Sequence, residues 1–109
     1  MPEALHRHEA LLRRIKALLQ VPYGDRLRGV ILYGSEARGE PSPESDVDIL
    51  VLLAGPVDLG KELQTIIEIL YPLQLELEQV LEVFPADEAE YLRGAYAWYR
   101  QAQKDAIRV

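Results

Sequence analysis

The sequence predicts a single α/β domain, of the α+β kind, in which a small mixed β-sheet is flanked by helices. Two apolar runs of strand length, residues 28–33 and 46–53, stand on either side of a polar segment rich in Gly, Pro and Ser. Amphipathic stretches with helical spacing precede and follow this pair of runs. The 109 residues allow one buried core and leave no room for a separate substrate domain, so residues 1–109 are expected to form one unit.

The first helix is expected over residues 2–20, with basic side chains mostly on its wet side. Its apolar stripe consists of Leu5, Leu12, Ile15, Leu18 and Leu19. His6 and His8 lie two residues apart and therefore do not share a helix face, which argues against a metal pair and for solvated side chains. Residues 21–25, which include a Pro and a Gly, are expected to end this helix.

The two apolar runs are expected to form the first two strands. The second run is almost continuously hydrophobic after Asp48, which is typical of a central strand buried on both faces. Ala54, Gly55 and Pro56 then turn the chain into a helix from residue 57 or 58 to about residue 70, which Pro72 is expected to bound.

The segment 73–84 fits either a strand or a helix, because Leu alternates with Glu and Gln, and all three are good helix formers. We favour a strand over residues 77–83, closed by Pro85 and placed beside the second strand. Asp87 is expected to cap a last helix over residues 88–103. The aromatic residues of that helix are too many for one stripe, so some are expected to cover the sheet and others to meet a partner. They are Tyr91, Tyr96, Trp98 and Tyr99.

Asp46 and Asp48 are the strongest candidates for a functional site. Side chains alternate between the two faces of a strand, so these two carboxylates project to the same side. Carboxylates so close repel each other unless a cation lies between them. Oxygen ligands without a nearby His or Cys favour Mg²⁺ or Mn²⁺, and Mg²⁺ usually joins carboxylates to substrate phosphates.

The Gly34-Ser35 turn after the first strand supplies the second half of this site. Gly34 allows the backbone to approach a ligand closely, and Ser35 is expected to cap a short helix through residues 36–38, whose free N–H groups attract anions. Alone, such a turn is usually only a turn, and an Asp pair is usually solvated. Together they predict a site that binds a metal and a phosphate. A P-loop is excluded, because Glu40 stands where its lysine should be.

These residues resemble the signature GSxARG…SDxD of the polymerase-beta-like nucleotidyltransferase superfamily, in particular its minimal nucleotidyltransferases. The matching residues are Gly34, Ser35, Ala37, Arg38, Gly39, Ser45, Asp46 and Asp48. The resemblance implies transfer of a nucleoside monophosphate from an NTP, such as ATP, to an acceptor hydroxyl. Asp46 and Asp48 would hold two Mg²⁺ ions, and Gly34 and Ser35 the β and γ phosphates. Arg38 would neutralise charge on pyrophosphate or pair with a nearby acid, and Ser45 would cap the approach to the second strand.

The superfamily also uses a third carboxylate on the next strand. Glu76, Glu78 and Glu82 share one strand face by parity. We favour Glu78 as this metal ligand and catalytic residue, with Glu82 next. Because Glu is longer than Asp and would move the metal, two hypotheses stay open: an active nucleotidyltransferase and an inactive module of the same fold that neutralises its partner by binding.

The resemblance also implies a protein partner. Minimal nucleotidyltransferases resemble antitoxins whose partner, encoded nearby, is a helical HEPN-domain protein, and the acceptor would be a Tyr hydroxyl on that toxin. The acceptor, the preferred base and any oligomer stay open.

Composition excludes several other classes of protein. The net charge of −6 argues against a general nucleic-acid binder, because phosphate contacts need clustered Lys and Arg. The absence of Cys excludes disulfides, thiol chemistry and a zinc–thiolate site. No signal peptide or long apolar run is visible, so a cytoplasmic protein without membrane association is expected.

Overall fold

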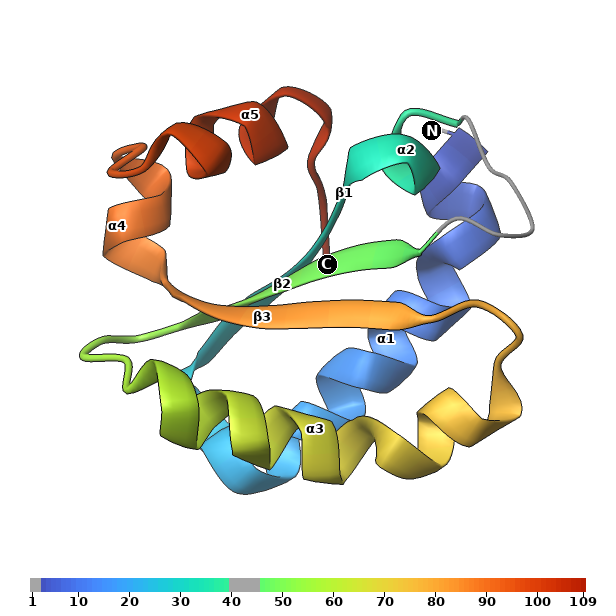
Figure 1. Cartoon of the computed structure of the whole chain (residues 1–109), viewed down its shortest axis with the longest axis horizontal. Coiled ribbons are helices and arrows are strands. Elements are labelled where there is room, and N and C mark those ends of the chain that lie inside the picture. Colours follow the sequence, from blue (N-terminus) through green and yellow to red (C-terminus); the bar gives the residue numbers. More distant parts are fainter. Residues whose placement is uncertain (1–2, 40–45) are drawn as a thin grey trace.

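The computed structural model describes residues 3–39 and 46–109 and contains a four-stranded mixed sheet (Figure 1). The strands are β1 (Leu27–Tyr33), β2 (Val47–Leu53), β3 (Leu81–Asp87) and β4 (Ile107–Arg108), in the order β3-β2-β1-β4. β2 pairs in parallel with β3, whereas β1 pairs antiparallel with both β2 and β4. The strand predictions for β1 and β2 are confirmed to within one residue.

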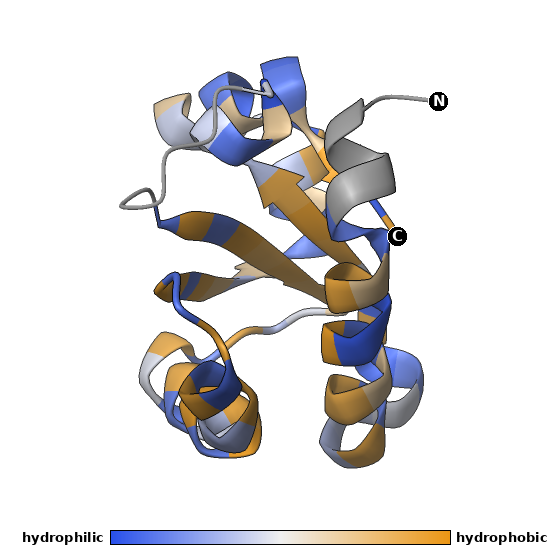
Figure 2. Cartoon of the chain, turned by 90° about the vertical axis from the view of Figure 1, so that its right-hand side faces the viewer, coloured by the Kyte–Doolittle hydropathy of each residue, from blue (hydrophilic) through white to orange (hydrophobic). Residues whose placement is uncertain are grey.

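Helices cover both faces of this sheet (Figure 2). α1 (Glu3–Tyr23) and α3 (Leu59–Glu76) pack on one face, and a 3₁₀ turn, Gly24–Arg26, joins α1 to β1. α2 (Gly34–Ala37), α4 (Glu88–Leu92) and α5 (Ala97–Asp105) lie on the other side. No helix in the described part of the chain is both long enough and apolar enough to span a membrane.

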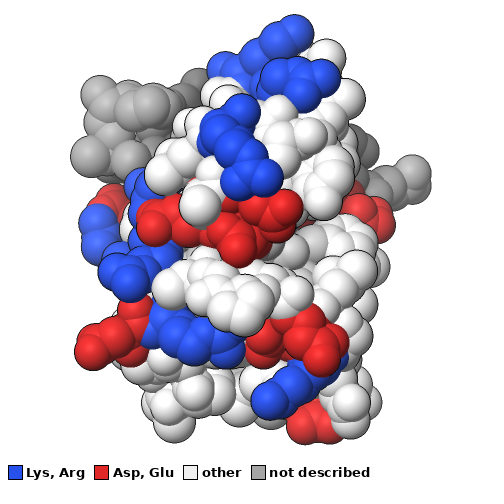
Figure 3. Space-filling view, turned by 90° about the vertical axis from the view of Figure 1, so that its left-hand side faces the viewer, with Lys and Arg blue, Asp and Glu red and all other residues white. Residues whose placement is uncertain are grey.

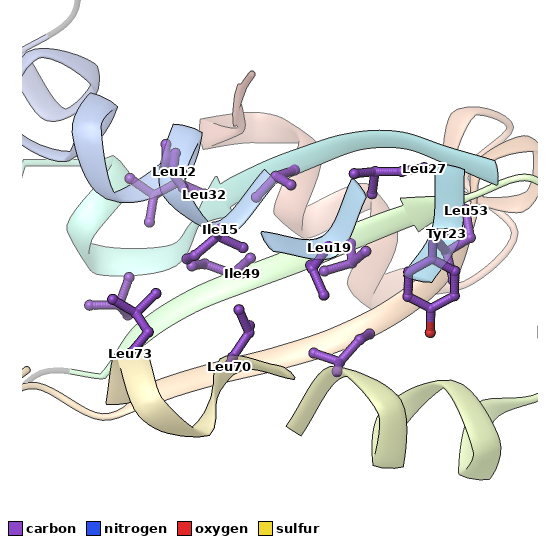
Figure 4. Packing of buried hydrophobic residues seen from close by; sticks show 14 residues of the cluster. Leu12, Ile15, Leu19, Tyr23, Leu27, Leu32, Ile49, Leu53, Leu70 and Leu73 are labelled. Carbon is purple, nitrogen blue, oxygen red and sulfur yellow. The ribbon is translucent and has the colours of Figure 1, made fainter. Parts of the chain in front are cut away.

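The main core lies between the sheet and the pair α1 and α3 (Figure 4). Leu12, Ile15 and Leu19 of α1 are fully buried against it, as their spacing predicts. A second, smaller core on the opposite face joins Leu50 and Leu52 of β2 to Tyr91 and Tyr99. β2 therefore has buried side chains on both faces, which confirms the prediction of a central strand.

Two prolines do not end their helices where the sequence predicts. α1 continues to Tyr23 with Pro22 in its last turn, and α3 continues to Glu76 through Pro72. Leu70 and Leu73, on either side of Pro72, are both buried in the main core. Burial of this apolar stripe outweighs the one backbone hydrogen bond that Pro72 removes.

The third strand begins four residues later than predicted. Gln74, near the end of α3, donates to Gln79 O at 2.9 Å and accepts from Leu81 N at 2.7 Å, which ties the connecting turn to the helix. β3 then runs through Pro85 instead of ending before it. A proline is tolerated there because β3 is an edge strand with one unpaired side.

The predicted last helix is two helices, because the chain breaks at Gly94, whose φ is +64°. The predicted cap is confirmed: Asp87 Oδ1 accepts from Ala89 N at 2.9 Å and from Glu90 N at 3.2 Å. After α5 the chain returns to pair with β1 as β4, a strand that the sequence does not predict.

Candidate active site

Gly34 forms the corner between β1 and α2. Its φ is +76°, and a Cβ atom placed on it would lie 2.5 Å from Asp48 Oδ2, so only glycine fits. Tyr33, rather than Ser35, is the N-cap residue of α2, and no side chain caps this helix. The predicted capping role of Ser35 is therefore wrong, because the helix begins two residues earlier. Ser35 lies in its first turn, and the turn is held directly beside the carboxylates.

Three carboxylates meet at the start of β2. Asp46 immediately precedes this strand, and Asp48 pairs with Tyr33 on one side and with Glu82 on the other. Hydrogen bonds from Glu82 reach both aspartate side chains. These hydrogen bonds, together with burial and the two negative charges, raise the pKa of Glu82 to about 7. Burial chiefly raises the pKa of Asp48.

Glu82, not Glu78, is the glutamate that β3 places level with the aspartates. Glu78 lies in the exposed turn before β3, and the predicted position of Glu78 within the strand is wrong. Glu76 is at the end of α3 and forms an ion pair with Arg14 at 2.6 Å. The prediction that all three glutamates share one strand face is therefore wrong, because the strand starts four residues later than predicted and only Glu82 lies on it. Glu82, the second choice from the sequence, joins the site instead.

Arg38 pairs with an acid on the opposite side of the site. Its Nη1 lies 3.3 Å from Asp105 Oδ2 of α5, in a partly exposed ion pair. Its positive charge also lowers the pKa of Asp48, against the stronger effect of burial. Of the two roles that the sequence leaves open for Arg38, pairing with an acid is therefore observed. Ser45 lies outside the described residues.

A buried polar cluster beneath α2 is the part of the site that the sequence misses. Glu36 is only 1% exposed and accepts from His8 Nε2 at 2.9 Å and from Gln79 Nε2 at 2.6 Å. These contacts tie α2 to α1 and to the turn before β3. His8 is buried, so the prediction that it is solvated is wrong. Contacts between residues 28 and 43 positions apart leave no periodic signal that could reveal them.

Tyr33 lies between the carboxylates and α5. Burial, followed by the negative charges of Asp48 and Glu82, raises the pKa of its hydroxyl to about 12. This hydroxyl therefore stays protonated at neutral pH and is available as a hydrogen-bond donor.

The surface around α4 and α5 carries mixed charge. On the face drawn in Figure 3, Lys and Arg side chains are interspersed with Asp and Glu. Arg108, for example, pairs with Glu88 at 2.8 Å. Positive and negative side chains are therefore mixed along this side of the molecule.

The donor atoms of the three carboxylates suit a hard cation, because all of them are oxygens. In the described part of the chain, no group of three or more His, Asp or Glu side chains stands in a preformed metal-binding arrangement. The three carboxyl groups are instead drawn together by shared hydrogen bonds. A divalent cation bound between the three carboxyl groups would take the place of the proton in the hydrogen bonds from Glu82 to Asp46 and Asp48.

Comparison with known proteins places this fold in the class of nucleotidyltransferases. The chain belongs to the nucleotidyltransferase domain family, whose model matches residues 10–97. This match confirms the predicted family.

Two relatives come from Methanocaldococcus jannaschii. The chain is 42% identical over 59 residues to the "putative protein adenylyltransferase MJ0141", a match that covers 54% of this chain and 59% of the relative, and so less than two thirds of the relative's length. It is 30% identical over 74 residues to the "putative protein adenylyltransferase MJ0604", which covers 68% of this chain and 72% of the relative.

The fold is also similar to that of a crystal structure of a toxin–antitoxin with AMP-PNP. The TM-score is 0.61 and the identity is 24%, over 88% of this chain and 69% of that chain. This similarity confirms the predicted mixed α/β nucleotidyltransferase fold.

Proposed function

We propose that this chain transfers a nucleoside monophosphate from a Mg²⁺-bound NTP, in particular ATP, to a hydroxyl group of a protein partner. The observation that carries this proposal is the meeting of Asp46, Asp48 and Glu82 beside the Gly34 turn. Carboxylates from two neighbouring strands suit a divalent cation, and a glycine corner with free backbone N–H groups suits phosphate oxygens.

In this proposal Asp46, Asp48 and Glu82 hold Mg²⁺, or Mn²⁺, and Gly34 and Ser35 bind the outer phosphates. A cation held by these carboxylates would neutralise the charge that develops on the phosphates during transfer. The acceptor oxygen forms a bond to the α phosphorus, the bond from that phosphorus to the bridging oxygen breaks, and pyrophosphate leaves. Glu82 is the candidate for taking the proton of the acceptor hydroxyl, because β3 places its carboxyl group level with Asp48.

We further propose that the acceptor is a Tyr hydroxyl on a helical, HEPN-type toxin encoded nearby, which gives this chain an antitoxin role. The "putative protein adenylyltransferase" relatives and the toxin–antitoxin neighbour support a protein acceptor. An apolar surface on the outside of α3 also favours a protein partner, since such surfaces usually mark binding sites. Its exposed members are Leu59, Ile67, Tyr71 and Leu75.

An inactive module that only binds its partner is the competing function. Exposed apolar surface would serve both functions equally. The inactive module does not need three carboxylates at one point, and like charges held together carry a cost in the metal-free protein. The position of Glu82 therefore favours the enzyme.

Labelled ATP distinguishes the two functions. The chain is incubated with Mg²⁺, the purified neighbouring toxin and ATP labelled on either the α or the γ phosphate. Label from the α position alone should appear on the toxin, and Asp48→Asn should abolish it. If the chain binds and silences the toxin while neither label is transferred, the inactive module is the correct function.

A further inference from the structure

An aromatic pocket lies next to the three carboxylates. Tyr33 of β1, Phe84 of β3 and Trp98 of α5 line a cavity of about 280 Å³. The Trp98 ring centroid lies 6.4 Å from that of Tyr33 and 6.5 Å from that of Phe84. Three rings from three separate elements thus converge on one space.

The position of the pocket follows from the strand register. Tyr33 is paired with Asp48 across the sheet and directly precedes Gly34. Phe84 follows Glu82 by two residues on β3, so the two side chains project from the same face about 7 Å apart. The aromatic pocket therefore lies directly beside the carboxylate side chains on the same face of the sheet. That separation suits a ligand whose phosphates lie on the carboxylates and whose other end is flat and aromatic.

The rings of this pocket are available to a ligand. Trp98 is 44% exposed and Phe84 is 41% exposed, whereas Tyr91 and Tyr99 of the neighbouring core are almost fully buried. Tyr99 packs against Trp98 with ring centroids 4.6 Å apart and so supports the indole from behind. An exposed indole held in place by a buried ring is a preorganised surface for stacking.

We propose that this pocket binds the base of the nucleotide, which stacks on Trp98 between Phe84 and Tyr33. This inference rests on the proposed function, because it assumes that the triphosphate lies on the carboxylates. The lining offers only two polar groups, the Tyr33 hydroxyl and the indole N–H of Trp98, so recognition comes mainly from stacking rather than from the hydrogen-bonding edge of the base. Purine NTPs should bind more tightly than pyrimidine NTPs, with little discrimination between ATP and GTP.

Trp98 provides a direct readout because it is the single tryptophan in the chain. The wild-type protein is titrated with Mg²⁺ and ATP, GTP, CTP or inorganic tripolyphosphate, while Trp98 fluorescence and the melting temperature are followed. We expect ATP and GTP to change the fluorescence saturably and more tightly than CTP. Tripolyphosphate should raise the melting temperature and compete with ATP, but leave the fluorescence nearly unchanged.

Variants then separate stacking from a general structural effect. Trp98→Leu should weaken ATP binding about tenfold, within the range for loss of one stacked base, and leave tripolyphosphate binding unchanged. Trp98→Phe keeps a ring and should restore most of the affinity. Tyr96→Leu is the matched control: Tyr96 is 51% exposed and lies two residues before Trp98, but does not line this pocket. It should bind ATP like the wild type.

The outcomes distinguish this inference from the proposed function. If neither tripolyphosphate nor any NTP binds with Mg²⁺, both the proposed function and the base pocket are wrong. If tripolyphosphate binds but NTPs leave Trp98 fluorescence unchanged, and Trp98→Leu binds ATP normally, only the base pocket is wrong. The aromatic pocket would then receive an acceptor side chain of the partner instead.

Discussion

Replacing Glu82 with Gln tests the site most directly, because it removes one charge and keeps the size of the side chain. The pKa of Glu82 is raised to about 7 by hydrogen bonds to Asp46 and Asp48, burial and their charges, from 4.5 in an unperturbed Glu. The folded protein therefore holds a proton that the unfolded chain releases at lower pH. The contribution of this proton to the free energy of unfolding is fully present below pH 4.5 and is lost as the pH rises through about 7.

The expected size of this effect follows from the same values. A pKa rise from 4.5 to about 7 corresponds to about 3 kcal/mol at most. Glu82 loses only part of its contact with water beside the aspartates and is otherwise exposed, so solvent screening reduces this to about 1 kcal/mol. In a domain of this size, about 1 kcal/mol shifts the melting temperature by about 4–6 °C. Metal-free Glu82→Gln should thus melt about 5 °C above the wild type at pH 8 and at the same temperature near pH 4.5.

Thermal unfolding in EDTA, followed by circular dichroism from pH 4.5 to 8, measures this difference. With saturating Mg²⁺ at pH 8, the wild type should have the higher melting temperature, because the cation binds to the Glu82 carboxylate that the variant lacks. Glu78→Gln is the matched control and should follow the wild type at every pH. A melting-temperature difference between the wild type and Glu82→Gln that does not depend on pH, or the same pH dependence in Glu78→Gln, would refute the assigned position of Glu82.

Four further variants and one control test the rest of the site. Asp46→Asn and Asp48→Asn should each abolish transfer of α-labelled phosphate and leave the metal-free fold intact or slightly more stable; transfer retained by either variant would overturn their role as ligands. Gly34→Ala should lose about 1–3 kcal/mol from backbone strain, and more from the contact with Asp48, together with Mg-ATP binding. Gly39→Ala, where φ is +77° but no atom of the described residues lies within 4 Å of the added Cβ, should lose only the strain part, so equal losses in urea unfolding would contradict this explanation. Glu36→Ala should cost about 2–3 kcal/mol in the same assay, because His8 loses its buried partner, and a cost below about 0.5 kcal/mol would show that the cluster does not stabilise α2.

The local features of the site were already determined by the sequence. Alternation along a strand is a property of the backbone, so the spacing of Asp46 and Asp48 predicted that they lie on one side. Asp46 directly precedes β2 instead of lying in it, and Glu82 reaches both carboxylates. The need for glycine at position 34 also followed from the motif, although the atom that approaches it closely is Asp48 Oδ2. The apolar runs similarly predicted β1 and β2, because a continuous hydrophobic strand is stable only when both faces are covered.

The tertiary structure alone decided which glutamate completes the site. The register of β3 depends on where α3 ends, and α3 passes Pro72 because Leu70 and Leu73 are buried in the core. Gln74 then fixes the turn and starts the strand at Leu81, which brings Glu82 rather than Glu78 beside Asp48. The end of α3, the turn and the start of β3 are not determined by local sequence. Each depends on free energy gained by packing against segments far along the chain. The pairing of Glu36 with His8 and the convergence of Tyr33, Phe84 and Trp98 were hidden for the same reason, since only the folded sheet brings these residues together.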